Sequence, residues 1–176
     1  MQHPVATMSF NITSIDPSRF REALGHYASG ITVITSLVDG ELIGFTCQSF
    51  YSVSMSPPLV SFSVMACSVS YPKIRKAGRF AVNILSNRQA WISNQFAQRG
   101  SDKWKGIERR ESPLGNPIIT DSLKWLDCKI HAEHAAGDHI IVIGEVKALN
   151  PEDAVARQPL LYFKGQYHNL ADHSMA

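Results

Sequence analysis

The dipeptide Asp39-Gly40 constrains the fold of this chain more than any other short segment, because it separates two apolar, β-branched stretches. Asp-Gly in such a position is the strongest short-range signal for a β-hairpin, since both residues tolerate the positive φ angles of a tight turn. The sequence therefore predicts that residues 31–38 (ITVITSLV) and the stretch at 43–53 (IGFTCQSFYSV) are neighbouring antiparallel strands.

Further strands are expected along most of the chain. They are predicted at residues 59–64, 80–85, 123–135, 140–146, 160–163 and 167–170. About seven strands joined mostly by hairpin-length connections, without regular strand-helix alternation, predict an antiparallel β-barrel. The fold class is therefore mainly β, with a few helices at the periphery.

Three helices are predicted beside these strands. The first begins at Asp16-Pro17, carries an apolar stripe of Phe20, Leu24 and Tyr27, and ends near Gly30. Two shorter helices are predicted at residues 70–76 and 88–96. Residues 99–117 are rich in charge, Gly and Pro, so they are predicted to form a long surface loop.

Composition indicates a single globular domain. The chain has 176 residues, of which 44% are hydrophobic and 18% are charged. This length is sufficient for one continuous core. Residues 16–170 are predicted to form the domain, between a flexible arm at 1–15 and a tail at 171–176.

Charge and cysteine content limit the possible binding partners and the cellular compartment of the protein. The net charge of +2 is small and the Lys and Arg residues form no stripe, which argues against nucleic acid as a partner. No apolar run approaches the roughly 20 residues of a membrane span, and the start of the chain does not resemble a signal peptide. The three cysteines have neither disulfide nor zinc spacing, so they are expected to be reduced thiols of a cytoplasmic protein.

Two runs of small, uncharged polar side chains suggest a binding wall. The first contains Thr46, Cys47, Gln48, Ser49 and Ser52, and the second contains Cys67, Ser68 and Ser70 and follows the strand at 59–64. Two neighbouring strands that end in such groups could hold a large, flat ligand with polar edges. The alternative is an ordinary sheet edge rich in Ser and Thr.

Four other polar residues have two interpretations each. His139 follows the predicted turn Gly137-Asp138, where it could donate a hydrogen bond or carry a proton, or simply face solvent. Asn83 lies in an apolar strand, so its amide needs partners from a ligand or from the backbone. Lys73 and Arg75 could face an anion near a helix N-terminus, or belong to a solvated helix face.

Signatures of several other protein classes are missing. The sequence contains no G-x-G-x-x-G after a strand, no G-x-x-x-x-G-K-[ST] and no G-x-S-x-G. His131 and His134 form an H-x-x-H motif, but residues three apart on a strand point to opposite faces. A metal site is therefore not expected.

Six segments in order resemble a known family. They are FREALGHYASGITVIT, GFTCQSFYSVS, PPLV, FAVNIL, GDHIIVIGEV and PLLYFKGQY, and they extend from about Phe20 to Tyr167. The chain resembles the short-chain flavin reductases, the NAD(P)H-dependent reductase components of two-component flavin monooxygenases. It is most similar to reductases that serve aromatic and steroid-ring hydroxylases.

This resemblance implies a split β-barrel of the FMN-binding, Greek-key type that forms a homodimer, with one flavin bound per subunit near the dimer interface. It implies FMN or FAD as the flavin, NADH or NADPH as the electron donor, and a flavin-dependent oxygenase as the partner that receives reduced flavin. The resemblance further implies that hydride would pass directly between the stacked rings, so no catalytic side chain is expected to be obligatory.

The resemblance also assigns site residues. The flavin ring and ribityl chain would be lined by Thr46, Cys47, Gln48, Ser49, Phe50, Ser52 and Val53. The phosphate end would be held by Cys67, Ser68, Val69, Ser70, Lys73 and Ile74. Phe96, Arg99 and Gly100 would cover part of the ring or the nucleotide tail, and the nicotinamide would meet His139, Phe163, Lys164 and Tyr167.

Cys47 and Gln48 depart from the Asn or Ala that many relatives carry, so contacts at the flavin edge are expected to differ in detail.

Three rival functions share the expected fold. They are a non-catalytic flavin-storage or flavin-sensing protein, a pyridoxal-phosphate-type oxidase and a corrinoid reductase. The oxidase would need several basic residues at one phosphate, and only Lys73 and Arg75 are near the expected site.

Overall fold

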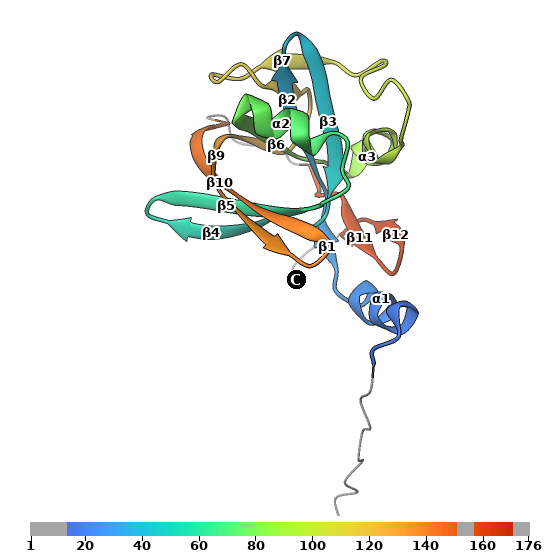
Figure 1. Cartoon of the computed structure of the whole chain (residues 1–176). Coiled ribbons are helices and arrows are strands. Elements are labelled where there is room, and N and C mark those ends of the chain that lie inside the picture. Colours follow the sequence, from blue (N-terminus) through green and yellow to red (C-terminus); the bar gives the residue numbers. More distant parts are fainter. Residues whose placement is uncertain (1–13, 151–156, 171–176) are drawn as a thin grey trace, which may run out of the picture.

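A computed structural model of the chain describes residues 14–150 and 157–170 (Figure 1). The predicted arm at 1–15 and tail at 171–176 lie outside the described residues, apart from Ser14 and Ile15. Within the described part, no helix is long and apolar enough to cross a membrane.

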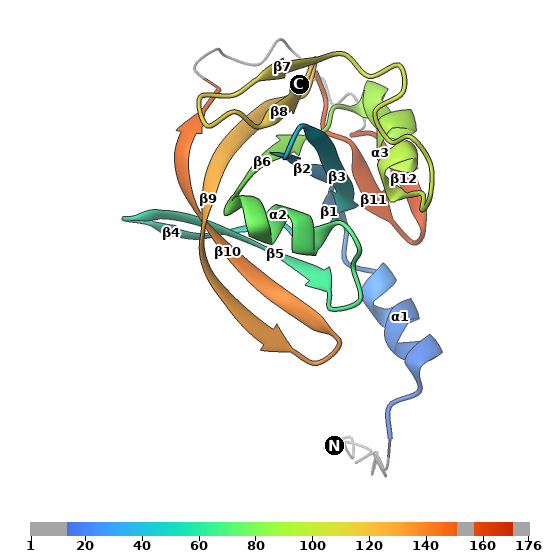
Figure 2. The ribbon, with the colours of Figure 1, turned by 45° about the horizontal axis from the view of Figure 1, so that its top comes forward.

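One curled, fully antiparallel sheet dominates the described structure. Its seven strands run in the order β3-β2-β6-β9-β10-β5-β4. Their bounds are β2 (Thr32–Val38), β3 (Glu41–Cys47), β4 (Tyr51–Met55), β5 (Pro58–Met65), β6 (Arg79–Ile84), β9 (Lys124–Ala136) and β10 (His139–Leu149). The outer strands β3 and β4 do not pair with each other, so the sheet curls without closing (Figure 2). This is the split form of the predicted mainly β barrel.

Smaller elements surround this sheet. A three-stranded sheet has the order β1-β11-β12, and β7 pairs with β8. These strands are β1 (Ser29–Gly30), β7 (Arg109–Glu111), β8 (Pro117–Ile119), β11 (Leu161–Phe163) and β12 (Gln166–His168). The helices are α1 (Pro17–Gly25), α2 (Tyr71–Ala77), the 3-10 turn η1 (Asn87–Gln89) and α3 (Ala90–Ala97).

The Asp39-Gly40 hairpin is confirmed. Val38 pairs with Glu41 across the two-residue turn, and Asp39 and Gly40 have φ angles of 50° and 83°. The single strand predicted at 43–53 is wrong, because β3 ends at Cys47 and the chain then turns into β4, which pairs with β5. Ser49 fixes this turn, since its hydroxyl bonds both backbone groups of Ser63.

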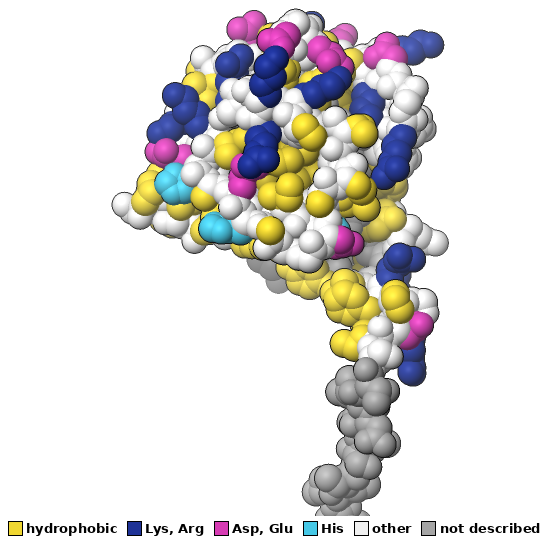
Figure 3. Space-filling model, viewed as in Figure 1, with side chains coloured by type: hydrophobic (Ala, Val, Ile, Leu, Met, Phe, Trp, Pro, Cys, Tyr) yellow, Lys and Arg dark blue, Asp and Glu magenta, His cyan; other side chains and the backbone are white. Residues whose placement is uncertain are grey.

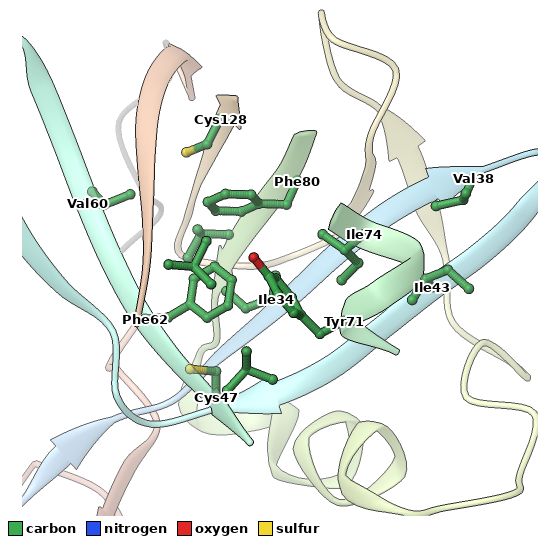
Figure 4. Close-up of a cluster of buried hydrophobic side chains, with 13 residues drawn as sticks. Ile34, Val38, Ile43, Cys47, Val60, Phe62, Tyr71, Ile74, Phe80 and Cys128 are labelled. Atoms are coloured by element: carbon green, nitrogen blue, oxygen red, sulfur yellow. The ribbon is translucent and has the colours of Figure 1, made fainter. Parts of the chain in front are cut away.

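The main core fills the curl of the sheet (Figure 4). Phe62 and Phe80 are fully buried at its centre with ring centroids 5.1 Å apart, and Tyr71 and Ile74 reach them from α2. Gly144 permits this packing, because a Cβ there would lie 2.4 Å from Cζ of Phe80. The core thereby fixes α2 against β2 and β6.

The first helix is shorter than predicted. Asp16 caps it as expected, and its carboxylate accepts hydrogen bonds from the backbone N–H groups of Ser18 and Arg19. The helix ends at Gly25 rather than near Gly30, because the chain turns there to enter β1. None of its residues is buried, and its apolar stripe of Phe20, Leu24 and Tyr27 is exposed.

The loop predicted at 99–117 also contains a short strand. Residues 109–111 pair with residues 117–119, where Ile118 and Ile119 are almost completely buried. The buried isoleucines anchor β8 and bring the charged β7 alongside it, an arrangement that the polar composition of the loop did not indicate.

Candidate functional site

A cavity of about 460 Å³ lies where β3 ends, between the β5–α2 turn and the C-terminus of α3. Its lining is formed by Phe45, Thr46, Cys47, Gln48, Ser49, Ser63, Val64, Met65, Cys67, Ser68, Val69, Ser70, Phe96, Ala97, Arg99, Lys103 and His139. Apart from Ser52, the residues of both polar runs therefore line one cavity. Figure 3 shows hydrophobic side chains interspersed with Lys and Arg on the face that includes α2 and β3.

Several hydroxyls of the first run are already engaged within the protein. Thr46 donates to the backbone carbonyl of Ser93 at 2.6 Å. Ser49 accepts from the N–H of Ser63 at 2.8 Å and donates to its carbonyl at 3.0 Å. These groups hold the wall of the cavity in place, and Gln48 is the exposed side chain of the run that remains available to a ligand.

The second run forms the turn before α2. Ser68 accepts a hydrogen bond from the N–H of Tyr71 at 3.2 Å, which starts the helix. The N–H of Ala66 donates to the carbonyl of Asp138 at 2.9 Å, so this turn is tied to the β9–β10 turn that carries His139. Cys67, exposed on this turn, faces the same cavity.

His139 lies at the rim of the cavity, opposite Met65 in the β10–β5 register. Its Nδ1 is 2.6 Å from Oδ1 of Asp138, and this hydrogen bond lowers the pKa of the Asp138 carboxyl below its usual value. Because Asp138 occupies Nδ1, the Nε2 atom of His139 is left to meet a ligand.

Arg99 and Lys103 are the two cations that line this cavity. Lys103 was missed in the sequence, because it lies in a charged segment predicted to be a surface loop. Its Nζ donates to the carbonyls of Phe96 at 2.9 Å and Gly44 at 3.2 Å. Partial burial lowers the pKa of this lysine.

Lys73 and Arg75 are both engaged in ion pairs. Lys73 pairs with Glu41 at 2.6 Å, and Arg75 Nε lies 2.8 Å from Glu133. Glu133 also accepts a hydrogen bond from the Tyr71 hydroxyl. The solvated helix face is therefore the better interpretation of Arg75, whereas Lys73 lines a neighbouring groove together with Gly100.

Other predicted site residues lie outside the cavity lining. Ile74 is fully buried in the main core, and its N–H donates to the carbonyl of Ser70. Phe50 packs against the same core, and Ser52 and Val53 are exposed on β4. The family resemblance assigned these residues to the flavin, but the chain turns after Cys47 into β4, whose residues do not line the cavity.

Of the four residues predicted to contact the nicotinamide, one lines the cavity and three do not. His139 lines the cavity, whereas Phe163, Lys164 and Tyr167 belong to the β11–β12 hairpin and do not line it. The Tyr167 hydroxyl lies 2.9 Å from Oγ of Ser93 and 2.8 Å from Oδ1 of Asn94 on α3. Tyr167 is thus connected to Thr46 through Ser93, which accepts from Thr46 with its carbonyl.

Asn83 is satisfied by the protein itself. Its Nδ2 donates to the Val33 carbonyl at 3.1 Å and to Thr35 Oγ1 at 3.0 Å, and its Oδ1 accepts from the Ile119 N–H at 2.8 Å. Of its two interpretations, the structural one holds. No group of three or more potential metal ligands occurs in the described part of the chain.

Comparison with known proteins decides the family. Residues 24–171 match the family model described as a flavin reductase like domain. The chain is 44% identical over 156 residues to HsaB, the reductase subunit of a flavin-dependent monooxygenase from Mycobacterium tuberculosis, covering 89% of this chain and 83% of that protein. The chain belongs to the flavin reductase family. A flavin reductase from Pseudomonas putida is 42% identical, covering 90% of this chain and 93% of its own length.

Solved structures confirm the fold of this flavin reductase. Nitrilotriacetate monooxygenase component B from Mycobacterium thermoresistibile superposes with a TM-score of 0.85 at 41% identity, covering 90% of this chain and 89% of that one. The NADH:FAD oxidoreductase SgcE6 from Streptomyces globisporus, solved with NAD and FAD fragments, has a TM-score of 0.84 at 30% identity and covers 92% and 98% of the two chains.

The donor set of the cavity fits a flavin. Phe45, Val64 and Met65 supply apolar surface for a flat ring, and Gln48 supplies an uncharged amide for its polar edge. Arg99 supplies positive charge for the phosphate of the same ligand. A flavin has these three parts in one molecule, so the residues present match the group that the family uses.

Proposed function

We propose that this flavin reductase transfers hydride from NADH or NADPH to FMN or FAD and delivers the reduced flavin to a partner oxygenase. The supporting observation is the single cavity that joins the polar end of β3, the 67–70 turn and His139. The flavin supplies a ring nitrogen that accepts hydride from the nicotinamide. The protein contributes by binding and aligning the two ligands, which requires no nucleophile or general base.

Specific residues have distinct parts in this proposal. Thr46 and Ser49 hold the backbone of the cavity wall through hydrogen bonds to Ser93 and Ser63, so the wall is preorganised. When His139 is neutral and donates Nδ1–H to Asp138, its Nε2 can accept a hydrogen bond from the nicotinamide carboxamide. Arg99, which lines the cavity, would interact with the phosphate of the flavin.

The proposal is tested by following NADH and NADPH oxidation at 340 nm with and without added FMN, FAD or riboflavin. We expect oxidation that depends on flavin and saturates with it. A protein that binds flavin but gives no oxidation above the non-enzymatic rate, with either nucleotide, would instead be the flavin-storage protein. Pairing the reductase with a candidate oxygenase would then test delivery of reduced flavin.

A homodimer is part of the same proposal. Phe20 and Leu24 on α1 are 53% and 57% exposed, and Tyr51 and Met55 on β4 are exposed as well. Apolar side chains grouped on protruding elements are commonly covered by a second copy of the chain.

We also place the enzyme in the cytoplasm, which is consistent with three cysteines that form no disulfide in the structure.

A further inference from the structure

A second groove, of about 600 Å³, adjoins the flavin cavity. Its lining is formed by Gly40, Glu41, Leu42, Ile43, Gly44, Val69, Ser70, Lys73, Gly100, Ser101, Asp102, Lys103 and Trp104. The two spaces share Val69, Ser70 and Lys103. A ligand that fills the first could therefore extend past these residues into the second.

Lys103 lies at the junction of the two spaces, and its ammonium group can donate one more hydrogen bond than it makes within the protein. Its ammonium has three protons, and the carbonyls of Gly44 and Phe96 accept two hydrogen bonds from it. It forms no ion pair with any carboxylate in the described part of the chain. A partly buried cation without an anionic partner is unfavourable, and a phosphate group of a ligand would compensate it.

The rest of the second groove suits a nucleoside. Trp104 lines the groove and packs edge-on against Phe96, with ring centroids 5.0 Å apart. Val69, 79% exposed, gives apolar surface on the shared side. Glu41 is neutralised by Lys73, and the carboxylate of Asp102 can accept hydrogen bonds from ribose hydroxyls.

We infer that Lys103 binds the diphosphate of FAD and that the second groove takes its adenosine half, so that this reductase prefers FAD to FMN. FAD is FMN extended by adenosine monophosphate through a diphosphate, and the two grooves meet at an unpaired cation where that diphosphate would pass. The inference rests on the proposed flavin reductase function and adds the choice of flavin to it.

Binding of FAD, FMN and riboflavin to the full chain tests the inference, with flavin fluorescence or calorimetry as the readout. We expect wild type to bind FAD about tenfold or more tightly than FMN, as one charge-assisted contact allows. Lys103→Met should weaken FAD binding about tenfold or more and change FMN and riboflavin binding less than about threefold. Lys105→Met is the matched control, because Lys105 is exposed two residues away, outside both grooves, and should leave all three affinities unchanged.

A second variant is needed because Lys103 also donates hydrogen bonds to two backbone carbonyls. Its replacement could therefore disturb local folding as well as ligand binding. Ser101→Glu places a negative charge on an exposed residue that lines only the second groove, and it should weaken FAD alone.

Equal affinity of wild type for FAD and FMN would overturn the inference. So would a parallel loss of riboflavin binding in Lys103→Met together with no effect of Ser101→Glu, which would make Lys103 purely structural. A higher KM for NADH with unchanged FAD affinity would assign the groove to the nicotinamide dinucleotide and also overturn it. In each of these cases flavin-dependent oxidation persists, whereas its absence with every flavin would reject the proposed function itself.

Discussion

The ring of Phe96 on α3 lies so close to the backbone of Gly44 on β3 that a Cβ on Gly44 would be 2.5 Å from the Cε1 atom of Phe96. The carbonyls of these two residues also accept hydrogen bonds from the same ammonium, that of Lys103. The missing side chain at Gly44 therefore lets α3 pack against the strand that carries Thr46, and it places Lys103 at the edge of the cavity proposed to bind flavin.

Gly44→Ala is expected to destabilise the protein by about 1–3 kcal/mol, because the added methyl group forces a buried aromatic ring to move. The free energy of unfolding from a denaturant titration measures this loss. Gly30→Ala is the matched control, since no atom lies within 4 Å of the site of its Cβ and its φ angle is not positive. A Gly44→Ala variant as stable as the Gly30→Ala variant would show that Phe96 packs less tightly than the structure indicates.

The three cysteines are expected to react very differently. Burial raises the pKa values of Cys47 and Cys128, so both thiols stay protonated and inaccessible at pH 8, whereas Cys67 is exposed. Titration of the native protein with a thiol reagent should therefore modify one residue, and titration in denaturant should modify all three. Cys67→Ser should abolish the native reaction.

Bound flavin should slow the native reaction of Cys67, because this residue lines the cavity. Equal rates with and without saturating flavin would contradict the assignment of the cavity as the flavin site.

Short-range patterns predicted the fold well. Asp39-Gly40 and the apolar strand patterns predicted the hairpin and the antiparallel sheet, because the conformation of a tight turn depends on a few adjacent residues. The break after Cys47 was missed, since it depends on Ser49 bonding Ser63 in another strand. No local pattern indicates such a partner.

Only part of the site could be predicted, because the partners of its side chains also lie far away in the sequence. Residue types identified Thr46 and Ser49 as hydrogen-bonding groups, but whether a hydroxyl serves a ligand or the protein depends on tertiary contacts. Lys103 lies 59 residues from Gly44 in sequence, and only the fold brings its ammonium to the Gly44 carbonyl. The resemblance assigned Ile74 to the phosphate end of the site, although it is fully buried in the core.

The apolar face of α1 gives a prediction about assembly. Light scattering at micromolar concentration should give about twice the chain mass of 19.5 kDa for wild type. Phe20→Asp combined with Leu24→Asp should lower this mass, because two carboxylates would have to be buried in the interface. Glu22→Lys, on the opposite side of the helix, is the control and should remain dimeric. A wild-type monomer under these conditions would reject the homodimer.

His139→Ala is expected to impair use of the nicotinamide more than binding of the flavin. Loss of one hydrogen bond to Nε2 should lower kcat/KM for NADH or NADPH about five- to a hundredfold, and the flavin dissociation constant should change much less. Asp138→Asn is the graded control, because its side-chain oxygen can still accept from Nδ1 and keep the imidazole oriented. The lowered pKa keeps Asp138 ionised down to pH values below its ordinary 3.8, so its carboxylate should remain a hydrogen-bond acceptor for Nδ1 across the neutral range. If flavin affinity collapses in His139→Ala while the nucleotide parameters hold, His139 belongs to the flavin site instead.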